Sequence, residues 1–387
     1  MRYEFATAGR IIFGPGAAAD LAALVESAGR RALLVHGRGA TTRGGPAAGV
    51  MQRLAARGLV AASYAAGSEP DVAAAEAAAA LAREAGCDCV VGIGGGSVLD
   101  TAKAAAALAA NAGGALAYLE VVGAGRALER PALPVVAVPT TAGTGSEATR
   151  NAVLGVPERR VKASMRHASM LPRLALVDPL LTHDMPPALT ASSGMDAITQ
   201  LIEAYVSRRA SPLTDALCLR ALPELDAALR RAYQRPEDAV AREAMSQAAL
   251  FSGMALANAG LGAVHGIAAA VGGAFPAPHG AVCAALLPHV TAANIRALRR
   301  AGAATATARY REIAQTLLGR QGPAEDALLE CLRDLAGALA IPGLARYGVT
   351  TADIPALAMA ASQASSTRSN PVALSQAELE ETIAAAL

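Results

Sequence analysis

Two polar side chains, Asp196 and Gln200, stand four residues apart in the otherwise apolar stretch SSGMDAITQLIEAY (192–205). If this stretch is a helix, both side chains lie on one face. A buried carboxylate requires a partner, and two histidines, His265 and His279, stand in other uncharged runs. A lone histidine in such a run is usually a hydrogen-bonded core residue, but two of them with a carboxylate predict a metal site of mixed nitrogen and oxygen ligands. Zn²⁺ or Fe²⁺ suits such a site, and the amide oxygen of Gln200 could serve as a weaker fourth ligand.

A glycine-rich turn follows a predicted strand in CVVGIGGGSVLDTAK (89–103). Gly94, Gly95 and Gly96 permit close backbone approaches that a Cβ would block, and Ser97 stands where a helix should begin. The backbone N–H groups and the helix dipole at that point are suited to a pyrophosphate. The turn lacks the G-x-G-x-x-G spacing, so an ordinary strand-to-helix turn is an equal alternative.

A second polar loop follows the predicted strand PVVAV (134–138). Hydroxyl groups at the carboxyl end of a strand lie where open α/β sheets bind ligands, so two such loops on neighbouring strands favour a shared nucleotide pocket. The alternative is a polar loop whose threonines only cap a helix. The residues concerned are Thr140, Thr141, Gly143, Thr144, Gly145 and Ser146.

The first half of the chain alternates short β-type runs with Ala-rich helical patterns. This alternation predicts a parallel sheet covered on both faces. Beyond residue 186 the β-type runs stop, and helix-like segments continue nearly to Leu387. We therefore predict an α/β domain over 1–180 and an all-helical domain over 181–387, with the site in the cleft between them. The predicted strands are 31–36, 59–64, 89–93, 134–138 and 174–177, and the predicted helices between them are 43–57, 71–86 and 98–111.

Composition argues against nucleic-acid and membrane partners. The 34 basic and 32 acidic residues nearly balance, so the charge shows no footprint for nucleic acid, and the 3% of aromatic residues with no Trp further weaken a base-stacking interpretation. The first residues do not resemble a signal peptide. The 52 residues from Ala244 to Ile295 carry no Asp, Glu, Lys or Arg, but glycines, prolines and histidines interrupt them, so they predict buried helices of a soluble protein.

The five cysteines predict a reducing, cytoplasmic location. None forms C-x-x-C, and an odd number argues against a secreted disulfide framework. Cys283, close to His279, is interpreted as a small buried hydrophobic residue.

Six separated motifs resemble, in order and spacing, the iron-containing (group III) alcohol dehydrogenase family, and they cover most of the chain. The resemblance implies a Rossmann-like N-terminal domain, a helical C-terminal domain of the dehydroquinate synthase-like fold, and a nicotinamide cofactor. The motifs are GGGSVLDTAK, PTTAGTGSE, LVDPLLTHDMP, SSGMDAITQLIEAY, NAGLGAVHG and PHGAVCAALLPH.

The resemblance also implies residue roles. Lys162, His265 and His279 would be catalytic. The pyrophosphate side of the cofactor would meet Gly95, Gly96, Ser97 and Asp100. Its adenine, ribose and nicotinamide side would meet Thr140, Thr141, Thr144, Ser146 and Lys162. The four metal-ligand positions are Asp196, Gln200, His265 and His279.

Two positions depart from the family pattern. Gln200 stands where the family commonly has His, which should weaken metal binding or change the metal. Ala269 stands where a second active-site His is frequent, so a proton-relay group could be missing.

The charge near Gly37 bears on the choice of cofactor. Family members that favour NAD often have Asp at this position, whereas Arg38 and Arg43 follow here. Without a carboxylate to repel a 2′-phosphate, we predict that NADP(H) is accepted or preferred over NAD(H). The alternative is that both arginines are solvated loop residues.

The activity implied is hydride transfer between nicotinamide and an alcohol or carbonyl substrate, with a divalent metal as Lewis acid. Without a metal, Lys162 or a nearby Arg would have to stabilise the substrate oxygen. Three alternatives stay open: a metal-independent maleylacetate reductase-like enzyme, a dehydroquinate synthase-type lyase, and a nucleotide-binding protein without turnover. A homodimer is expected from the family habit.

Overall fold

The structure of the protein is a computed structural model that describes residues 2–38, 45–319 and 324–387. The chain divides into two compact units. Residues Thr7–Met185 form what we call the α/β unit, and Pro186–Leu387 together with the N-terminal residues up to Ala6 form the helical unit.

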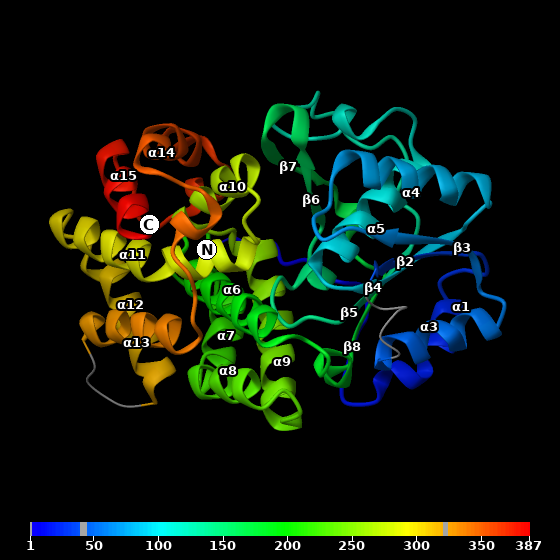
Figure 1. Cartoon of the computed structure of the whole chain (residues 1–387), viewed down its shortest axis with the longest axis horizontal. Helices are drawn as coiled ribbons and strands as arrows, with labels where there is room; N and C mark the ends of the chain where they lie inside the picture. The colour runs from blue at the N-terminus through cyan, green and yellow to red at the C-terminus, as the bar shows by residue number, and fades with distance from the viewer. Residues whose placement is uncertain (1, 39–44, 320–323) are drawn as a thin grey trace. The chain divides into compact units, whose positions relative to one another are not determined.

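A six-stranded parallel sheet lies at the centre of the α/β unit, in the order β1-β8-β5-β4-β2-β3 (Figure 1). Its five longer strands confirm the predicted parallel sheet. The edge strand β1 was not predicted because three residues are too few to show a pattern. The strands are β1 Ile11–Phe13, β2 Ala32–Gly37, β3 Val60–Ala66, β4 Cys89–Gly94, β5 Val135–Pro139 and β8 Leu174–Val177.

Helices cover both faces of this sheet, as a fully buried parallel sheet requires. Successive residues of β2 point to opposite faces: Leu33 and Val35 pack with α4 and α5, while Leu34 packs with α1 and α3. Figure 1 shows these two pairs of helices on the two sides of the sheet. The helices are α1 Leu21–Glu26, α3 Pro46–Ala56, α4 Val72–Glu84 and α5 Gly96–Ala110. Strands β4 and β5 pair side by side in the middle of the sheet.

An antiparallel hairpin was missed by the sequence patterns. No strand was predicted between 138 and 174, but β6 (Asn151–Val156) pairs with β7 (Val161–Arg166). The turn between them places Arg160 at a positive φ of 52°. The arginines here gave the hairpin a loop-like composition, while its inward residues, such as Leu154 and Met165, are buried on the core.

The helical unit contains no strand among its described residues, which confirms the predicted all-helical second half. Helix α6 packs against α9 and α11, and residues 2–6 join this unit because the backbone of Ala6 exchanges hydrogen bonds of 2.8 and 2.9 Å with the side chain of Asn258. Figure 1 shows these helices from green to red. Their bounds are α6 Pro187–Val206, α7 Pro212–Ala221, α8 Leu225–Gln234, α9 Ala239–Ala259, α10 Ala263–Ala274, α11 His279–Arg300, α12 Ala304–Leu318, α13 Glu325–Ala338, α14 Ile354–Gln363 and α15 Gln376–Ala385.

Helix α11 is long and apolar enough by composition to cross a membrane, but its apolar stretch is 78% buried inside the fold. It is therefore a core helix of the helical unit.

Candidate metal centre and cofactor loops

Helix α6 presents three polar side chains on one buried face. Asp196, Gln200 and Glu203 follow one another at helical spacing, and these residues are only 1%, 3% and 4% exposed. Most other buried residues of α6 are apolar, so this stripe is the polar part of an otherwise hydrophobic packing surface.

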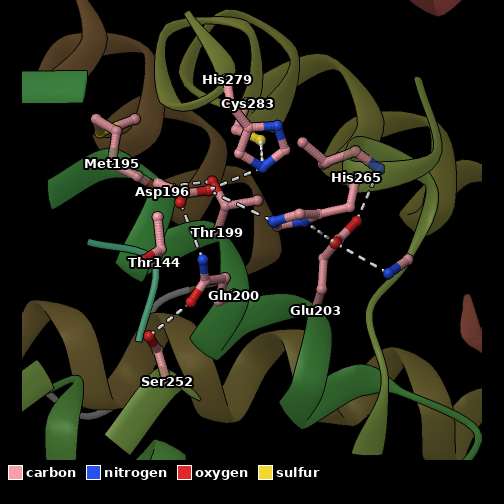
Figure 2. A network of polar contacts seen from close by, with 12 residues as sticks. Thr144, Met195, Asp196, Thr199, Gln200, Glu203, Ser252, His265, His279 and Cys283 are labelled. Carbon is pink, nitrogen blue, oxygen red and sulfur yellow. Dashed lines mark hydrogen bonds and ion pairs between the residues drawn. The ribbon is translucent and has the colours of Figure 1, made fainter. Parts of the chain in front are cut away.

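Two histidines from other helices meet this stripe (Figure 2). His265 lies in the first turn of α10, and its Nε2 is 3.4 Å from Asp196 Oδ1. His279 begins α11, and its Nε2 is 3.8 Å from the same oxygen. The two imidazole rings lie 5.3 Å apart between centroids. The residues predicted to be ligands on three separate segments therefore come together.

The orientation of His265 is set by Glu203. The carboxylate of Glu203 lies 2.7 Å from His265 Nδ1 and accepts hydrogen bonds from the backbone N–H groups of Gly262 and Val264 at the start of α10. A Cβ on Gly262 would lie 2.7 Å from the Glu203 carboxylate, so this approach requires glycine. Because the Glu203 carboxylate accepts the Nδ1 proton of His265, the other ring nitrogen, Nε2, is directed toward Asp196.

Asp196, His265 and His279, with the residues that contact them, form what we call the cluster. Two of its buried polar atoms lack hydrogen-bond partners among the described residues: Asp196 Oδ1 and His265 Nε2. An unsatisfied buried polar atom costs about 1–3 kcal/mol, so two that face each other mark the place of a missing partner.

The electrostatics of the cluster favour a positive charge. Burial alone would raise the pKa of Asp196, but the imidazoles of His265 and His279 lower it. Burial likewise opposes the imidazolium of His265, yet Cys283, Asp196 and Glu203 raise its pKa well above the usual value. A proton or a metal cation can supply this charge.

Gln200 is beside the cluster, but its amide is already engaged. The amide nitrogen donates to Asp196 Oδ2 at 2.9 Å, and the amide oxygen accepts from the Ser252 hydroxyl on α9 at 2.7 Å. In this arrangement Gln200 orients the carboxylate (Figure 2). That its oxygen ligates a metal stays a prediction. Ala269 is half-buried one turn after His265 on α10.

The cluster also contains Cys283, which the sequence patterns assigned to the apolar core. Its Sγ is 3.6 Å from His279 Nε2, and the donor atoms of Asp196, His265, His279 and Cys283 all lie within 4.8 Å of one another. Glu203 was likewise not predicted as a site residue, although it stands seven residues after Asp196, on the same helix face.

In the α/β unit, the two predicted loops meet at the carboxyl ends of β4 and β5. A Cβ on Gly95 would lie 3.1 Å from the Thr141 side chain, and one on Gly96 would lie 2.7 Å from the Thr144 side chain. The loop of Gly94, Gly95 and Gly96 therefore packs directly against the loop of Thr140, Thr141 and Thr144. The N–H of Thr140 also donates to Gly94 at 2.9 Å, and Ser97 donates to the carbonyl of Gly67 at 3.3 Å.

Asp100 and Ser146 join these two loops. Asp100 Oδ1 accepts from the Ser146 hydroxyl at 2.6 Å and pairs with Lys103 at 3.1 Å, while Oδ2 accepts from the N–H of Val153 at 2.9 Å. The Lys103 ammonium is fully buried and also donates to the Ser146 carbonyl and the Thr149 hydroxyl. Burial lowers the pKa of Lys103, and burial raises that of the neighbouring Glu147 to about 7.

The remaining predicted cofactor residues are placed separately. Lys162 lies on β7 and pairs with Glu69 at 2.6 Å. Gly37 ends β2, the strand beside β4, and the exposed Arg38 follows it. Arg43 lies outside the described residues.

Two family models match nearly the whole chain. "Iron-containing alcohol dehydrogenase" matches residues 8–179, and "Fe-containing alcohol dehydrogenase family, C-terminal" matches residues 190–387. The NAD-dependent methanol dehydrogenase of Bacillus methanolicus is 40% identical over 296 residues, which cover 75% of this chain and 74% of that protein. Alcohol dehydrogenase 4 of Saccharomyces cerevisiae is 37% identical over 363 residues, which cover 93% of this chain and 92% of that protein.

Solved structures show the same likeness over the full length. A crystal structure of 1,3-propanediol oxidoreductase matches with a TM-score of 0.92 and 32% identity, covering 100% of both chains. Sulfoacetaldehyde reductase from Bifidobacterium kashiwanohense, in complex with NAD⁺, matches with a TM-score of 0.87 and 28% identity, covering 100% of this chain and 99% of that one.

Proposed function

Because the chain belongs to the iron-containing alcohol dehydrogenase family and is an oxidoreductase acting on CH–OH groups, we propose that it transfers a hydride between nicotinamide and a small alcohol or aldehyde. The proposal includes a divalent metal held by Asp196, His265 and His279. One observation carries it: the buried Asp196 Oδ1 and His265 Nε2 face each other at 3.4 Å, and neither has a hydrogen-bond partner among the described residues.

The donor set fits such a metal. One carboxylate oxygen and two imidazole nitrogens are ligands that Zn²⁺ and Fe²⁺ both accept. When bound, the metal would act as a Lewis acid toward the substrate oxygen. Glu203 keeps the proton of His265 on Nδ1, and Gln200 restrains the carboxylate of Asp196, so the ligands are held ready by residues that would not themselves touch the substrate.

We assign cofactor binding to the joined loops of the α/β unit. The N-terminus of α5, at Gly95, Gly96 and Ser97, offers backbone N–H groups and a helix dipole to the pyrophosphate. Thr140, Thr141 and Thr144 would supply hydroxyl groups beside it. Asp100 and Ser146 would act by holding these loops together, since their side chains bond to each other. Lys162, paired with Glu69, is proposed for the nicotinamide side.

The absence of a carboxylate at the end of β2 supports use of NADP(H). Gly37 ends that strand and the exposed Arg38 follows it, so a 2′-phosphate would meet a cation instead of an anion. NAD(H) remains the cofactor named for the methanol dehydrogenase relative.

The wider assignment follows from the family and the composition. The named substrates of relatives, methanol and 1,3-propanediol, support a small primary alcohol or its aldehyde as substrate. We further propose a cytoplasmic homodimer, divided by function into a cofactor domain over 1–180 and a metal and substrate domain over 181–387.

The test is the oxidation of NADH and NADPH with a panel of short aldehydes, followed by absorbance. Net, stoichiometric consumption of cofactor with formation of alcohol supports the proposal. Cofactor binding without net consumption on any substrate would contradict it and favour a lyase or a non-catalytic nucleotide-binding protein. Turnover of maleylacetate-type keto acids that persists without metal would favour the metal-independent reductase.

A further inference from the structure

We propose that the Cys283 thiolate, and not the Gln200 amide predicted from the sequence, is the fourth protein ligand of the metal. This inference rests on the proposed metal centre, and it narrows the metal to one that prefers sulfur and nitrogen donors.

The first support is the position of the thiol. Cys283 stands four residues after His279 on α11, so both side chains lie on the same helix face. Its residue is fully buried, and its Sγ is 3.6 Å from His279 Nε2. A buried cysteine alone is a common core residue. Here it is directed into a space where Asp196 Oδ1 and His265 Nε2, both buried, have no hydrogen-bond partner among the described residues.

The second support is the spacing of the donor atoms. In a tetrahedral zinc site with bonds of about 2.0–2.1 Å to N and O and about 2.3 Å to S, neighbouring ligand atoms lie about 3.3 Å apart, and nitrogen–sulfur pairs about 3.6 Å. The observed separations are 3.4 Å and 3.8 Å from Asp196 Oδ1 to the two Nε2 atoms, and 3.6 Å from Sγ to His279 Nε2. Three edges of the cluster therefore already approach those of a coordination tetrahedron.

The third support is that Gln200 is committed elsewhere. To offer its oxygen to the metal, the amide would have to release Ser252 and stop donating to Asp196 Oδ2. A simple exchange of its oxygen and nitrogen would place the amide oxygen against the carboxylate oxygen, which is repulsive. The hydrogen-bond contact of the Cys283 thiol, 3.6 Å from His279 Nε2, joins two of the four clustered donor atoms, so a metal would replace a contact inside the cluster and release no residue outside it.

The donor set then has consequences for metal choice. A carboxylate and a thiolate together neutralise a divalent cation, and a thiolate with imidazoles favours Zn²⁺ over harder cations. Gln200, on α6, stands where the family commonly has His. Cys283, on α11, would compensate for the loss of that histidine ligand.

The experiment is to load metal-free protein with Co²⁺ and record its absorption spectrum, because a thiolate ligand adds an intense sulfur-to-cobalt charge-transfer band in the near ultraviolet. We expect this band in the wild type, its loss in Cys283→Ser, and weaker visible bands from cobalt in both. Cys218→Ser is the matched control, since Cys218 is equally buried in the helical unit on α7, outside the cluster, and its loss should leave the band unchanged.

A rescue separates coordination from packing. In a Cys283→Ala background, Gln200→His should restore Co²⁺ affinity without restoring the charge-transfer band, because an imidazole would replace the sulfur. Co²⁺ bound to the wild type without that band, or a band that survives Cys283→Ser, would overturn this inference alone. A wild type that binds no Co²⁺ at all would overturn the metal centre together with it.

Discussion

Two carboxylates in this chain have opposite surroundings. On α5 of the α/β unit, both oxygens of Asp100 have partners: the Ser146 hydroxyl and Lys103 on one, the N–H of Val153 on the other. In the helical unit, Asp196 has a partner on Oδ2 from Gln200, while its buried Oδ1 has no hydrogen-bond partner among the described residues.

The difference in hydrogen bonding distinguishes Asp100, a carboxylate that stabilises the fold, from Asp196, a carboxylate that we propose as a metal ligand. A carboxylate whose bonds are all supplied by its own fold stabilises that fold, and a ligand would have to break those bonds to reach it. A buried carboxylate oxygen without a hydrogen-bond partner costs stability until something binds there. Substitutions of the two residues should therefore affect different measurements.

The largest effect is expected from Asp196→Asn. Asparagine keeps the shape of the side chain but removes the charge, so metal content should fall sharply and kcat/KM should fall by at least about 10²-fold, since a Lewis acid contributes several kcal/mol. Elemental analysis and steady-state kinetics would measure both. Full metal content with near-normal turnover would show that Oδ1 is not a ligand.

Asp100→Asn should give the reverse result. It leaves the fully buried Lys103 without its ion-pair partner, so the free energy of unfolding should fall by about 3 kcal/mol in urea titrations. Metal content should not change, which makes the two variants controls for each other. If stability is unchanged, Glu147 supplies the countercharge for Lys103, and Asp100 is free for another role.

Glu203→Gln tests whether metal binding depends on the hydrogen bond between Glu203 and His265 Nδ1. Glutamine can still accept the Nδ1 proton of His265, but it lacks the negative charge, and its NH2 group would oppose a backbone N–H that the carboxylate now accepts, so metal affinity should fall by about 10- to 100-fold. Titration of metal-free protein with Zn²⁺ measures this directly. An affinity equal to that of the wild type would mean that the charge of Glu203 does not contribute to metal binding.

The smallest effect is expected from Arg38→Ala, at the residue that follows β2. Loss of an exposed cation should lower the ratio of kcat/KM for NADPH over NADH by about three- to fivefold and leave metal content unchanged. Arg57→Ala is the control, because Arg57 is an exposed arginine of the same unit that pairs with Glu26. Equal effects of the two substitutions would remove Arg38 from the 2′-phosphate assignment.

The sequence predicted the features that follow from periodicity and local chemistry. The buried strands and Ala-rich helices indicated the parallel sheet, and the spacing of Asp196 and Gln200 placed both on one face of α6. The hairpin of β6 and β7 was missed because its arginines resemble a loop, and its inward face is recognisable only from the core that it packs against.

The contacts that define the candidate metal centre depend on distant residues. Gln200 is oriented by Ser252, which is 52 residues away, and Glu203 bonds to His265, which is 62 residues away. Helical spacing alone shows that Glu203 follows Asp196, and Cys283 follows His279, on one face. Only the packing of α6, α10 and α11 shows that these faces meet (Figure 2).

The most direct test is the metal content of protein purified without added metal or chelator, measured beside its turnover. We expect about one Zn²⁺ or Fe²⁺ per chain, with metal and turnover lost together on chelation and restored together on adding the ion back. Metal-free protein that still turns over at the full rate would contradict this expectation.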